Sequence, residues 1–532
     1  MFQKQTIPLT TTELFSSLFL DYISQSEKVK SFYNNHISSK NFSSYLEKNK
    51  FDYLNRTILV ESLNKQSNLV ANTSASSKTN ITLLQKPTTY SITTGHQLCL
   101  FTGPLYFIYK IASTINLSKA LKANFPDKDF VPVYWMASED HDFEEINHVF
   151  AFGKKVTWNS LQKGAVGEFS TEGLQDVISE LKTILGENEK SNELIQLFEK
   201  AYIHHSNLAD ATRYLVNELF GEYGIIILDG NDSDLKTLFK EEFKKDIFEN
   251  TSVQLVNKTI DELKQHYSAQ VTPRDINVFY KENGLRERVE KQGSGYVVLN
   301  TDIKFTEQEL KNIIETTPEK FSPNVVLRPL YQQKILPNIA YVGGPGELAY
   351  WLEYKSMFEA YNIHLPILMP RNFVMLVDKG TQNKMQKLNL NINDVFKSGE
   401  ELVKAFIKTQ HDDINLEEAK TKITSIFSSV LETVANIDKT LVGTTEAEKQ
   451  KAINGLATIE QKINRALKQK SETDVNQIWA IKEKLFPKNV PQERYDNFSM
   501  YYTKFGKEFI SNLMNELTYD LEKFEYMVLK EV

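Results

Sequence analysis

Cysteine is almost absent from this chain of 532 residues, which contains Cys99 alone. A single cysteine excludes an internal disulfide and any metal site of the CxxC type. Long hydrophobic runs are also missing, because no apolar stretch approaches the roughly 20 residues that span a bilayer. The first residues lack the basic start and unbroken apolar segment of a secretory signal. These absences predict a cytoplasmic protein with no membrane association.

A surplus of basic residues is lacking as well. The chain has 62 Lys and Arg residues against 69 Asp and Glu residues, a formal net charge of -7. Without a basic surplus, nucleic acid is not an expected partner. The hydrophobic fraction of 41% and the charged fraction of 25% are typical of a globular protein, and the length allows more than one structural unit.

Several common catalytic motifs are missing from the sequence. It has no GxGxxG, no Walker loop, no HExxH and no serine nucleophile elbow, so a standard dinucleotide, P-loop or zinc-protease assignment is unsupported. Cys99 lies among Leu98, Leu100 and Phe101, and a cysteine in such company is expected to be a small buried hydrophobe and not a nucleophile.

What the sequence does contain is a series of short apolar runs, each ending in small or polar residues. Helical segments at 104–123, 232–249 and 346–361 separate several of them. Runs that are apolar on both faces fit buried parallel strands. The pattern predicts an α/β fold with a doubly wound, Rossmann-like parallel-sheet core. The predicted strands are 90–95, 131–138, 224–230, 339–344 and 365–371.

Long gaps follow the second and third predicted strands. A plain crossover needs only some tens of residues, so we expect two inserted subdomains, at about 150–222 and 250–337. The predicted organisation is an N-terminal helical segment, a core that carries the insertions, and a C-terminal helical region. The three parts are 1–85, 86–377 and 378–532.

Two segments outside the core have a distinct composition. Residues 67–82 are rich in Ser, Thr and Asn and are predicted to form a loop. Residues 416–441, and a second stretch after them, repeat apolar residues at three-, four- or seven-residue steps. This repeat predicts two helices around a short turn, either as an antiparallel coiled coil or as amphipathic helices packed on the core.

Ligands of open α/β sheets bind beyond the carboxyl ends of the strands. The first predicted strand runs into "TTGHQLCLFTGPLYFIYK" (93–110), where Thr102 suits the N-cap and Pro104 the first turn of a helix. Such a helix start favours phosphate or carboxylate; alternatively, the glycines only shape a turn and Lys110 lies in solvent. The candidate binding residues here are Thr94, Gly95, His96, Gln97, Thr102, Gly103, Tyr106 and Lys110.

The second predicted strand runs into "SEDHDFEEINH" (138–148). Carboxylates so close together raise one another's pKa unless a cation compensates. The cation is Mg²⁺, a substrate ammonium or an arginine; the alternative is a solvated acidic turn. No dense zinc spacing is present, so a permanent transition metal is not expected. The candidate catalytic residues are Glu139, Asp140, His141 and Asp142, with Glu139, Asp140 and Asp142 as candidate Mg²⁺ ligands and Asn147 and His148 as candidate binding residues.

The fourth and fifth predicted strands also end in residues suited to anions. Gly343, Gly344 and Gly346 open a helix as a second possible anion cradle, with Glu347 in its first turn, and all four are candidate binding residues; alternatively, Glu347 caps that helix. Arg328 and Arg371 suit bidentate binding of phosphate or carboxylate, or else form surface ion pairs.

Four of these segments together resemble one family, the bacillithiol-biosynthesis cysteine-adding enzymes (BshC). The segments are "TGHQLCLFTGPLYFIYK", "VPVYWMASEDHDFEEINH", "RPLYQQKILPNIAYVGGPGELAYW" and "PILMPRN". They stand in the family's order, and the likeness extends over essentially the full chain. The chain departs from the family pattern at His96, where many members have Gln, and at Cys99, where many have a small residue.

The resemblance implies a nucleotidyltransferase-like Rossmann core with two connecting-peptide insertions and a C-terminal coiled coil that forms a homodimer. It also implies a ligase that joins L-cysteine to glucosaminyl malate through an amide bond, the last step of bacillithiol biosynthesis. Activation of the cysteine carboxyl group then requires ATP or a related nucleotide with Mg²⁺, as an acyl-adenylate or an acyl-phosphate.

Site roles follow from that reaction as expectations. The helix starts at 102–106 and 344–347, with Arg371, are expected to hold phosphates. The acidic cluster is expected to bind an amine or Mg²⁺, and Asp140 or His141 to take a proton from the attacking amine. Two alternatives remain: a metal-dependent hydrolase or deacetylase built on the acidic cluster, and a non-catalytic nucleotide-binding coiled-coil assembly protein.

Overall fold

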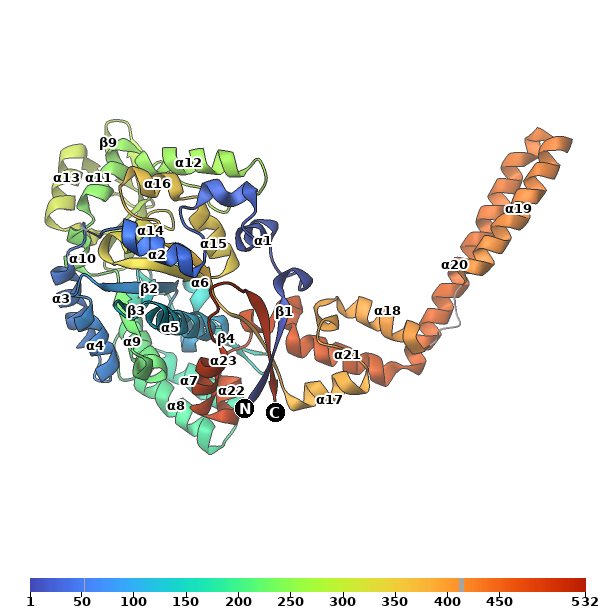
Figure 1. The fold of residues 1–532 in the computed structure, drawn as a ribbon, viewed down its shortest axis with the longest axis horizontal. Helices are drawn as coiled ribbons and strands as arrows, with labels where there is room; N and C mark the ends of the chain where they lie inside the picture. Colours follow the sequence, from blue (N-terminus) through green and yellow to red (C-terminus); the bar gives the residue numbers. More distant parts are fainter. Residues whose placement is uncertain (52, 411–415) are drawn as a thin grey trace. The chain divides into compact units, whose positions relative to one another are not determined.

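A computed structural model describes residues 1–51, 53–410 and 416–532 (Figure 1). Residues 411–415, within the predicted C-terminal region, therefore lie outside the described residues. The chain divides into two compact units. Unit 1 comprises 1–375, 491–530 and 532, and unit 2 comprises 376–490 and 531.

The core of unit 1 is a parallel sheet of five strands in the order β13-β12-β2-β3-β6. Every residue of β2 is buried, as expected of a strand covered on both faces. The strands coincide with the five predicted apolar runs, so the Rossmann-like core is confirmed. Their bounds are β2 (Thr89–His96), β3 (Asp129–Met136), β6 (Ile226–Asp229), β12 (Asn338–Gly343) and β13 (Ile367–Pro370).

The strand order reverses between β2 and β12. From β2 the chain builds outward through β3 to β6, and it then returns to the other side of β2 to add β12 and β13. Ligands bind at such a reversal because the connections leave the carboxyl ends of the two central strands in opposite directions. Helix α5 (Tyr106–Asn124) packs on β2 and β3, and α15 (Pro345–Leu352) packs on β12 and β13.

The two long crossovers carry structure of their own. The connection from β3 to β6 contains α6 (Phe143–Ile146), the hairpin β4 (His148–Ala151) and β5 (Lys154–Thr157), α7 (Leu174–Leu185), α8 (Glu189–Tyr202) and α9 (Leu208–Phe220). The connection from β6 to β12 contains a five-stranded antiparallel sheet in the order β10-β9-β8-β7-β11. That these segments are separate subdomains stays a prediction.

The strands of this second sheet are β7 (Val278–Glu282), β8 (Leu285–Gln292), β9 (Gly295–Val298), β10 (Lys304–Thr306) and β11 (Phe321–Pro323). The helices of the same connection are α10 (Ser233–Thr237), α11 (Lys240–Glu249), α12 (Thr251–Leu263), α13 (Glu307–Thr316) and α14 (Arg328–Ile335), and α16 (Lys355–Ala360), which follows α15, packs on α12. The segment predicted as one helix, 232–249, is two helices, because the backbone breaks at Leu238 and Phe239.

The N-terminal region begins with a strand that the sequence did not predict, β1 (Phe2–Pro8). The helices that follow are α1 (Ser17–Ile23), α2 (Ser39–Lys48), α3 (Arg56–Ser67) and α4 (Ala75–Leu83). The prediction of a loop over 67–82 is wrong for α4. The Ser74 side chain caps this helix by accepting the N–H of Ser77, and Ile81 is buried, so capping and packing outweigh the polar composition.

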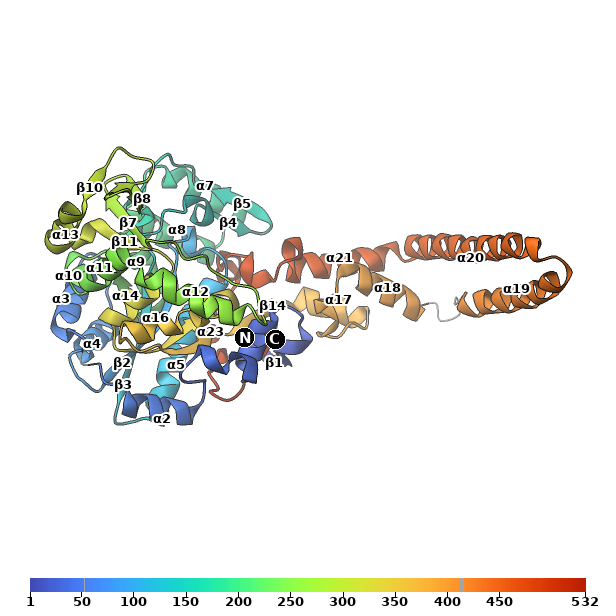
Figure 2. The ribbon, with the colours of Figure 1, turned by 90° about the horizontal axis from the view of Figure 1, so that it is seen from above.

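Unit 2 is helical, and its longest elements form a hairpin. Helix α19 (Glu417–Ile437) runs beside α20 (Val442–Lys470) in both ribbon views (Figures 1 and 2). No side chain of α19 is buried, so this hairpin is the predicted coiled coil and not a pair of helices covered by a core. The other helices of the unit are α17 (Lys379–Lys387), α18 (Gly399–Gln410) and α21 (Glu472–Leu485).

After unit 2 the chain re-enters unit 1 through residues 491–498, which we call the return segment. It continues into α22 (Ser499–Phe505), α23 (Glu508–Glu516) and β15 (Glu525–Glu531), and β15 lies between β1 and β14 (Phe373–Val377) in a three-stranded sheet. In the described residues, no helix has the length and apolar character needed to cross a membrane.

Candidate functional site

A buried ion pair crosses the point where the strand order reverses. The ammonium of Lys110, on α5, lies 2.8 Å from both carboxylate oxygens of Glu347, on α15, and it also donates to the carbonyl of Gly95. The Lys110 side chain is 3% exposed, so the alternative that it lies in solvent is wrong. Burial lowers the pKa of Lys110, and the Glu347 carboxylate opposes that effect.

Glu347 also fills the helix start that was predicted to cradle an anion. Its carboxylate accepts the backbone N–H of Gly344 and the hydroxyl of Tyr341, both at 2.8 Å. Burial raises the pKa of Glu347, but Lys110 and these hydrogen bonds outweigh burial and lower it. The start of α15 therefore already holds a carboxylate of its own chain, and the capping role considered for Glu347 is confirmed.

The loop between β2 and α5 is strained. Phe101, Thr102 and Gly103 have consecutive positive φ angles of 50°, 73° and 65°, and two of them are not glycine. A Cβ on Gly103 would lie 2.6 Å from the Cβ of Cys99, so glycine is required there. The prediction that Thr102 caps the helix is wrong, because its left-handed backbone delays the helix to Tyr106, with Leu105 at the N-cap.

The return segment forms hydrogen bonds with this strained loop. The Asn497 amide donates to the carbonyls of Phe101 (2.9 Å) and Gly103 (2.6 Å). The N–H of Leu105 donates to the carbonyl of Asp496 at 2.8 Å. The helix start at 102–106 is thus partly occupied by the chain itself, because one of its backbone donors is already paired.

The two predicted arginines lie against the glycines at the ends of β2 and β12. A Cβ on Gly95 would lie 3.5 Å from Nη1 of Arg328, and one on Gly344 would lie 3.9 Å from Nε of Arg371. Both distances are ordinary van der Waals contacts, so each guanidinium lies directly beside the end of a strand. Arg371 is 2% exposed and pairs with Glu493 through contacts of 2.6 and 2.8 Å, so a surface ion pair is excluded for it.

His96 is a neutral imidazole at the end of β2. Its Nδ1 lies 2.9 Å from the carbonyl of Gln97, and its ring lies 5.2 Å from the ring of Tyr106. Burial and the neighbouring Lys110 charge lower the pKa of His96 to about 3. Its Nε2 is buried and, among the residues that the structure describes, has no hydrogen-bond partner. Because the Gln97 carbonyl only accepts, Nδ1 carries the hydrogen, and Nε2 of the neutral ring is an unused acceptor.

Cys99 is 6% exposed, and burial raises the pKa of its thiol to about 12. A thiol that stays protonated is a poor nucleophile. The prediction that Cys99 is a small buried hydrophobe is confirmed.

Asp140 is the best-positioned carboxylate of the acidic stretch. It accepts the Gln97 amide at 2.9 Å and the backbone N–H of His141 at 2.7 Å. Burial raises the pKa of Asp140, but these hydrogen bonds and the charge of Arg286 lower it overall. Gln97 also donates to Glu145 at 2.6 Å. Asp140 is therefore ionised at neutral pH and tied through Gln97 to the end of β2.

His141 is held by an arginine from the antiparallel sheet. Nη1 of Arg286, on β8, lies 2.5 Å from Nδ1 of His141. Burial and the Arg286 charge lower the pKa of His141, so the ring is neutral at neutral pH. Because a guanidinium only donates, Nδ1 must accept and Nε2 must carry the hydrogen. In this arrangement His141 is a hydrogen-bond donor, and the role of proton acceptor is left to Asp140.

The other acidic residues do not converge on one point. Glu139 turns to the buried ammonium of Lys236, at 2.6 Å, and Asp142 is exposed. In the described part of the chain, no three His, Cys, Asp or Glu side chains are grouped so that they could hold a metal ion. Glu139, Asp140 and Asp142 therefore do not form a ready ligand set for Mg²⁺. Asn147 is buried and lies 3.0 Å from Nδ1 of His148, at the start of β4.

Two models of known protein families match this chain, and together they span nearly all of its residues. The family model described as "Bacillithiol biosynthesis BshC, N-terminal Rossmann-like domain" matches residues 2–372, and the one described as "Bacillithiol biosynthesis BshC, C-terminal coiled-coil domain" matches residues 374–531. The chain belongs to the BshC family. The resemblance drawn from the four motifs is confirmed.

Individual relatives span nearly the same length. A protein of Flavobacterium johnsoniae is 43% identical over 96% of this chain and 97% of its own, and one of Flavobacterium psychrophilum is 43% identical over 94% and 95%. A more distant one from Bacillus cytotoxicus is 28% identical over 93% and 95%. Each is named "Putative cysteine ligase BshC". These matches do not favour the hydrolase or the assembly protein.

In this BshC-family chain, several residues near the site could not be identified from the sequence. Glu493, Arg494 and Asn497 come from the return segment, far along the chain from the loops they contact. Arg286 comes from the antiparallel sheet. None lies in a recognisable motif, and each becomes visible only when the chain is folded. The charged pair "ER" (493–494), shortly after Pro491, was the one available signal.

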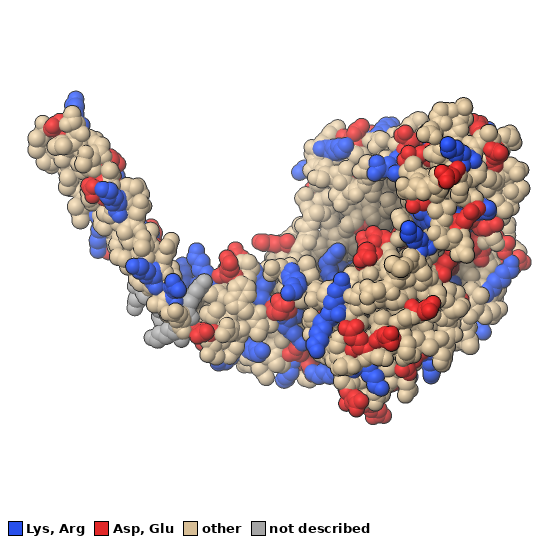
Figure 3. Space-filling view, turned by 180° about the vertical axis from the view of Figure 1, so that it is seen from behind, with Lys and Arg blue, Asp and Glu red and all other residues tan. Residues whose placement is uncertain are grey.

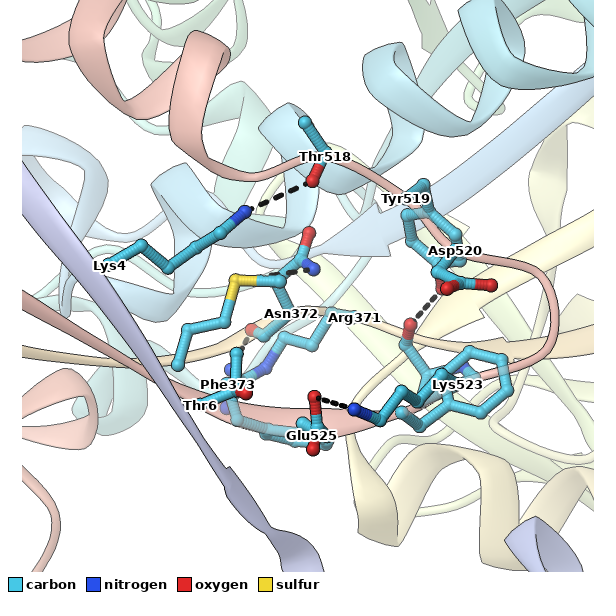
Figure 4. A pocket seen from close by; sticks show the side chains of 13 residues that line it. Lys4, Thr6, Arg371, Asn372, Phe373, Thr518, Tyr519, Asp520, Lys523 and Glu525 are labelled. Carbon is cyan, nitrogen blue, oxygen red and sulfur yellow. Dashed lines mark hydrogen bonds and ion pairs between the residues drawn. The ribbon is translucent and has the colours of Figure 1, made fainter.

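A cavity of about 270 Å³ also escaped prediction (Figure 4). Its walls come from β1, the end of β13 and the segment before β15. Lys4 points towards Thr518 (3.1 Å), and Lys523 points towards Glu525 (3.0 Å). Both lysine ammonium groups in the cavity wall therefore already have partners within the chain. On the face shown in Figure 3, unit 1 is hollowed, and acidic and basic side chains both lie around the hollow.

Proposed function

We propose that this chain is a cysteine ligase that joins the carboxyl group of L-cysteine to the amine of glucosaminyl malate, the last step of bacillithiol biosynthesis. Membership of the BshC family and the names of its relatives support the ligase class. One observation carries the proposal. Two regions of opposite charge meet at the end of β2, with Arg328 near Gly95 and Asp140 bonded to Gln97. Amino acid and amino sugar acid substrates carry both charges.

The proposed reaction needs an activated carboxyl group, because a carboxylate does not acylate an amine unaided. ATP or a related nucleotide with Mg²⁺ would supply the leaving group, as an acyl-adenylate or an acyl-phosphate. The amine nitrogen forms the new bond to the carboxyl carbon, one carboxyl oxygen leaves with the phosphate group, and the amine loses a proton. Each of these steps favours fixed cations near the leaving group and an anion near the amine.

Among the residues of the chain, Asp140 is assigned first to amine binding. Its lowered pKa makes it a weak base but a good partner for an ammonium group. It then accepts the proton released as the carbon–nitrogen bond forms. His141 donates through Nε2 to an oxygen of the substrate. Arg328 suits a carboxylate or phosphate, because its hydrogen bond to Oε1 of Gln332, at 3.0 Å, goes to a neutral group.

Mg²⁺ would screen the charge of the nucleotide phosphates and polarise the transferred group. The described acidic residues form no ready ligand set, so the proposed reaction uses no metal bound by the protein alone. A metal-dependent hydrolase would instead need such a set, and metal analysis of the purified protein distinguishes the two functions.

We also propose a homodimer formed through the coiled coil. The hairpin leaves large apolar side chains exposed along α19, with Ile426, Val430 and Ile437 at 61%, 41% and 77% exposure. An exposed apolar stripe at helical spacing is typical of a helix that pairs with another chain.

The test is mass spectrometry of a thiol-trapped mixture of purified protein, glucosaminyl malate, L-cysteine and Mg-ATP. The ligase predicts a product with the mass of bacillithiol that is absent without protein. Release of AMP or ADP in the same tube then identifies the activation route. Folded protein that forms no product with any nucleoside triphosphate would contradict the proposal.

A further inference from the structure

The ring of Tyr106 lies close to two guanidinium groups. Its centroid is 5.4 Å from Cζ of Arg371 and 5.7 Å from Cζ of Arg494. The ring of His96 lies 5.2 Å away, at the end of β2. Tyr106 is the first residue of α5, so this group stands where the strand order reverses. Arg494 therefore belongs in space to the candidate site, although it lies on the return segment.

The positive charges around this point differ in how far the chain neutralises them. Glu347 neutralises Lys110, and Glu493 neutralises Arg371, in two pairs that are largely buried. Arg494 is exposed. Among the residues that the structure describes, no carboxylate lies within ion-pair distance of it. Its five N–H donors are thus available to a ligand in a way that those of Arg371 are not.

The backbone that carries Arg494 is fixed on both sides. Before it, Glu493 binds Arg371 and also accepts the N–H of Val374 at 3.0 Å. After it, Asp496 and Asn497 bind the loop that leads into α5. The N–H of Arg494 itself donates to the carbonyl of Pro491 at 2.8 Å. An exposed guanidinium on such a fixed segment needs little further ordering when it binds.

The loop held by the return segment is itself strained, with Phe101 and Thr102 in the left-handed region. Strained backbone persists only where the surroundings hold it, and it is concentrated at ligand sites. In this chain the residues that hold it, Asp496 and Asn497, directly follow Arg494 and Tyr495. The same contacts therefore maintain the loop and place the guanidinium beside Tyr106.

We propose that Arg494 binds an anionic oxygen group, carboxylate or phosphate, of the substrate that lies against Tyr106. The planar fork of arginine matches both groups with two parallel hydrogen bonds. The two sources of such a group are the nucleotide phosphates and the malate carboxylates of the sugar substrate. This assignment of sources rests on the proposed function, whereas the anion site itself rests on Tyr106, Arg494 and the return segment.

The test measures binding in the absence of L-cysteine, so that no turnover is needed. Isothermal titration of the full-length protein with Mg-ATP and, separately, with glucosaminyl malate compares wild type with R494A and R494K. Arg274, another exposed arginine of unit 1, gives the matched control R274A. We expect R494A to weaken one probe about tenfold or more, R494K to lie between, and R274A to match wild type. The probe that loses affinity identifies the source of the anion.

Two results would overturn the proposal. One is R494A binding both probes as wild type does, and the other is wild type binding neither probe at millimolar concentration. Melting curves of the variants show that the fold is retained. In turnover assays the proposal predicts a higher KM for the same substrate and a nearly unchanged kcat, which a merely structural role would not produce. If wild type binds but does not ligate, the proposed function fails while the anion site stands.

Discussion

The ammonium of Lys110 lies 2.8 Å from each carboxylate oxygen of Glu347. This pair joins α5 to α15 at the carboxyl ends of the neighbouring strands β2 and β12, and it brings one positive and one negative charge to the candidate site. It places a carboxylate at the start of α15 and a neutralised lysine under Gly95. Anions of a substrate must then find other partners, and the exposed or half-buried arginines nearby are those partners.

Replacing Glu347 by Gln should leave the buried Lys110 charge without a carboxylate. We expect E347Q to lower the free energy of unfolding by roughly 3–5 kcal/mol, because removing one partner of a buried pair strands the other. The double variant K110M/E347L should recover most of that loss. Urea unfolding followed by tryptophan fluorescence, in a W479F background, reports on unit 1 alone, since the remaining tryptophans lie there.

The matched control is E307Q, which breaks the exposed pair of Glu307 with Lys311. Its effect should stay below about 1 kcal/mol. Equal effects of E347Q and E307Q would contradict the structural role given to the Lys110–Glu347 pair.

Replacing His96 by Gln should change how stability depends on pH. The folded pKa of His96 is about 3, below the unfolded value of about 6.5. As pH falls through 6.5 the unfolded chain takes up a proton that the folded chain does not, so unfolding becomes easier between pH 6.5 and 3. In this pH range the free energy of unfolding should depend on pH less steeply in H96Q than in wild type, by up to about 1.4 kcal/mol per pH unit. Stability curves at pH 8, 6 and 5 test this; parallel curves for H96Q and wild type would contradict it.

Replacing Asn497 by Ala should release the strained loop. Two buried carbonyls lose their donor, which costs roughly 2–4 kcal/mol, and Tyr106 loses its fixed position. We expect N497A to lower both the free energy of unfolding and the rate of ligation, each measured at 25 °C. The control N454A removes an exposed asparagine of α20 and should be close to neutral. Retained activity and stability in N497A would show that the loop keeps its conformation unaided.

Replacing Asp140 by Asn should abolish the anionic partner of the substrate amine. We expect D140N to lower kcat/KM for ligation by about 100-fold or more. H141Q should cost less, because Gln retains an N–H donor. The exposed carboxylate of Asp176, on α7, provides the control D176N. Full turnover in D140N would remove the acid–base role of Asp140.

Placing charge on the apolar stripe of α19 should separate the proposed dimer. Ile426 and Val430 are exposed, and I426E/V430E should convert a dimer into a monomer in light scattering at micromolar concentration. S428E, at an exposed serine of the same helix, should leave the mass unchanged. A wild-type protein that already has the mass of a monomer would contradict the dimer.

The sheet could be predicted because its strands are buried on both faces, and such strands leave continuous apolar runs such as "GIIILDG". The coiled coil could be predicted for a similar reason, since its period is local. Asp140 and Gln97 could be expected near each other because β2 and β3 are parallel neighbours whose ends meet at one edge. In each case the pattern that determines the structure is local in sequence.

Other parts of the site could not be predicted, because they depend on contacts between distant segments. Nothing near Glu493 or Asn497 in the sequence indicates that they bind Arg371 and the loop before α5. The tautomer of His141 depends on Arg286, which lies on another sheet. The helix start before Tyr106 was predicted too early because Thr102 and Pro104 suit a helix locally, whereas the contacts with Asp496 and Asn497 hold a left-handed turn instead.

The most direct test of the proposed function supplies isotope-labelled L-cysteine with glucosaminyl malate and Mg-ATP, and follows the product by mass spectrometry with wild type and D140N in parallel. We predict that wild type gives bacillithiol carrying the full mass of the label, and that D140N gives it at least about 100 times more slowly. Labelled cysteine that stays wholly unincorporated, with wild-type protein folded and each nucleoside triphosphate tried, would contradict it.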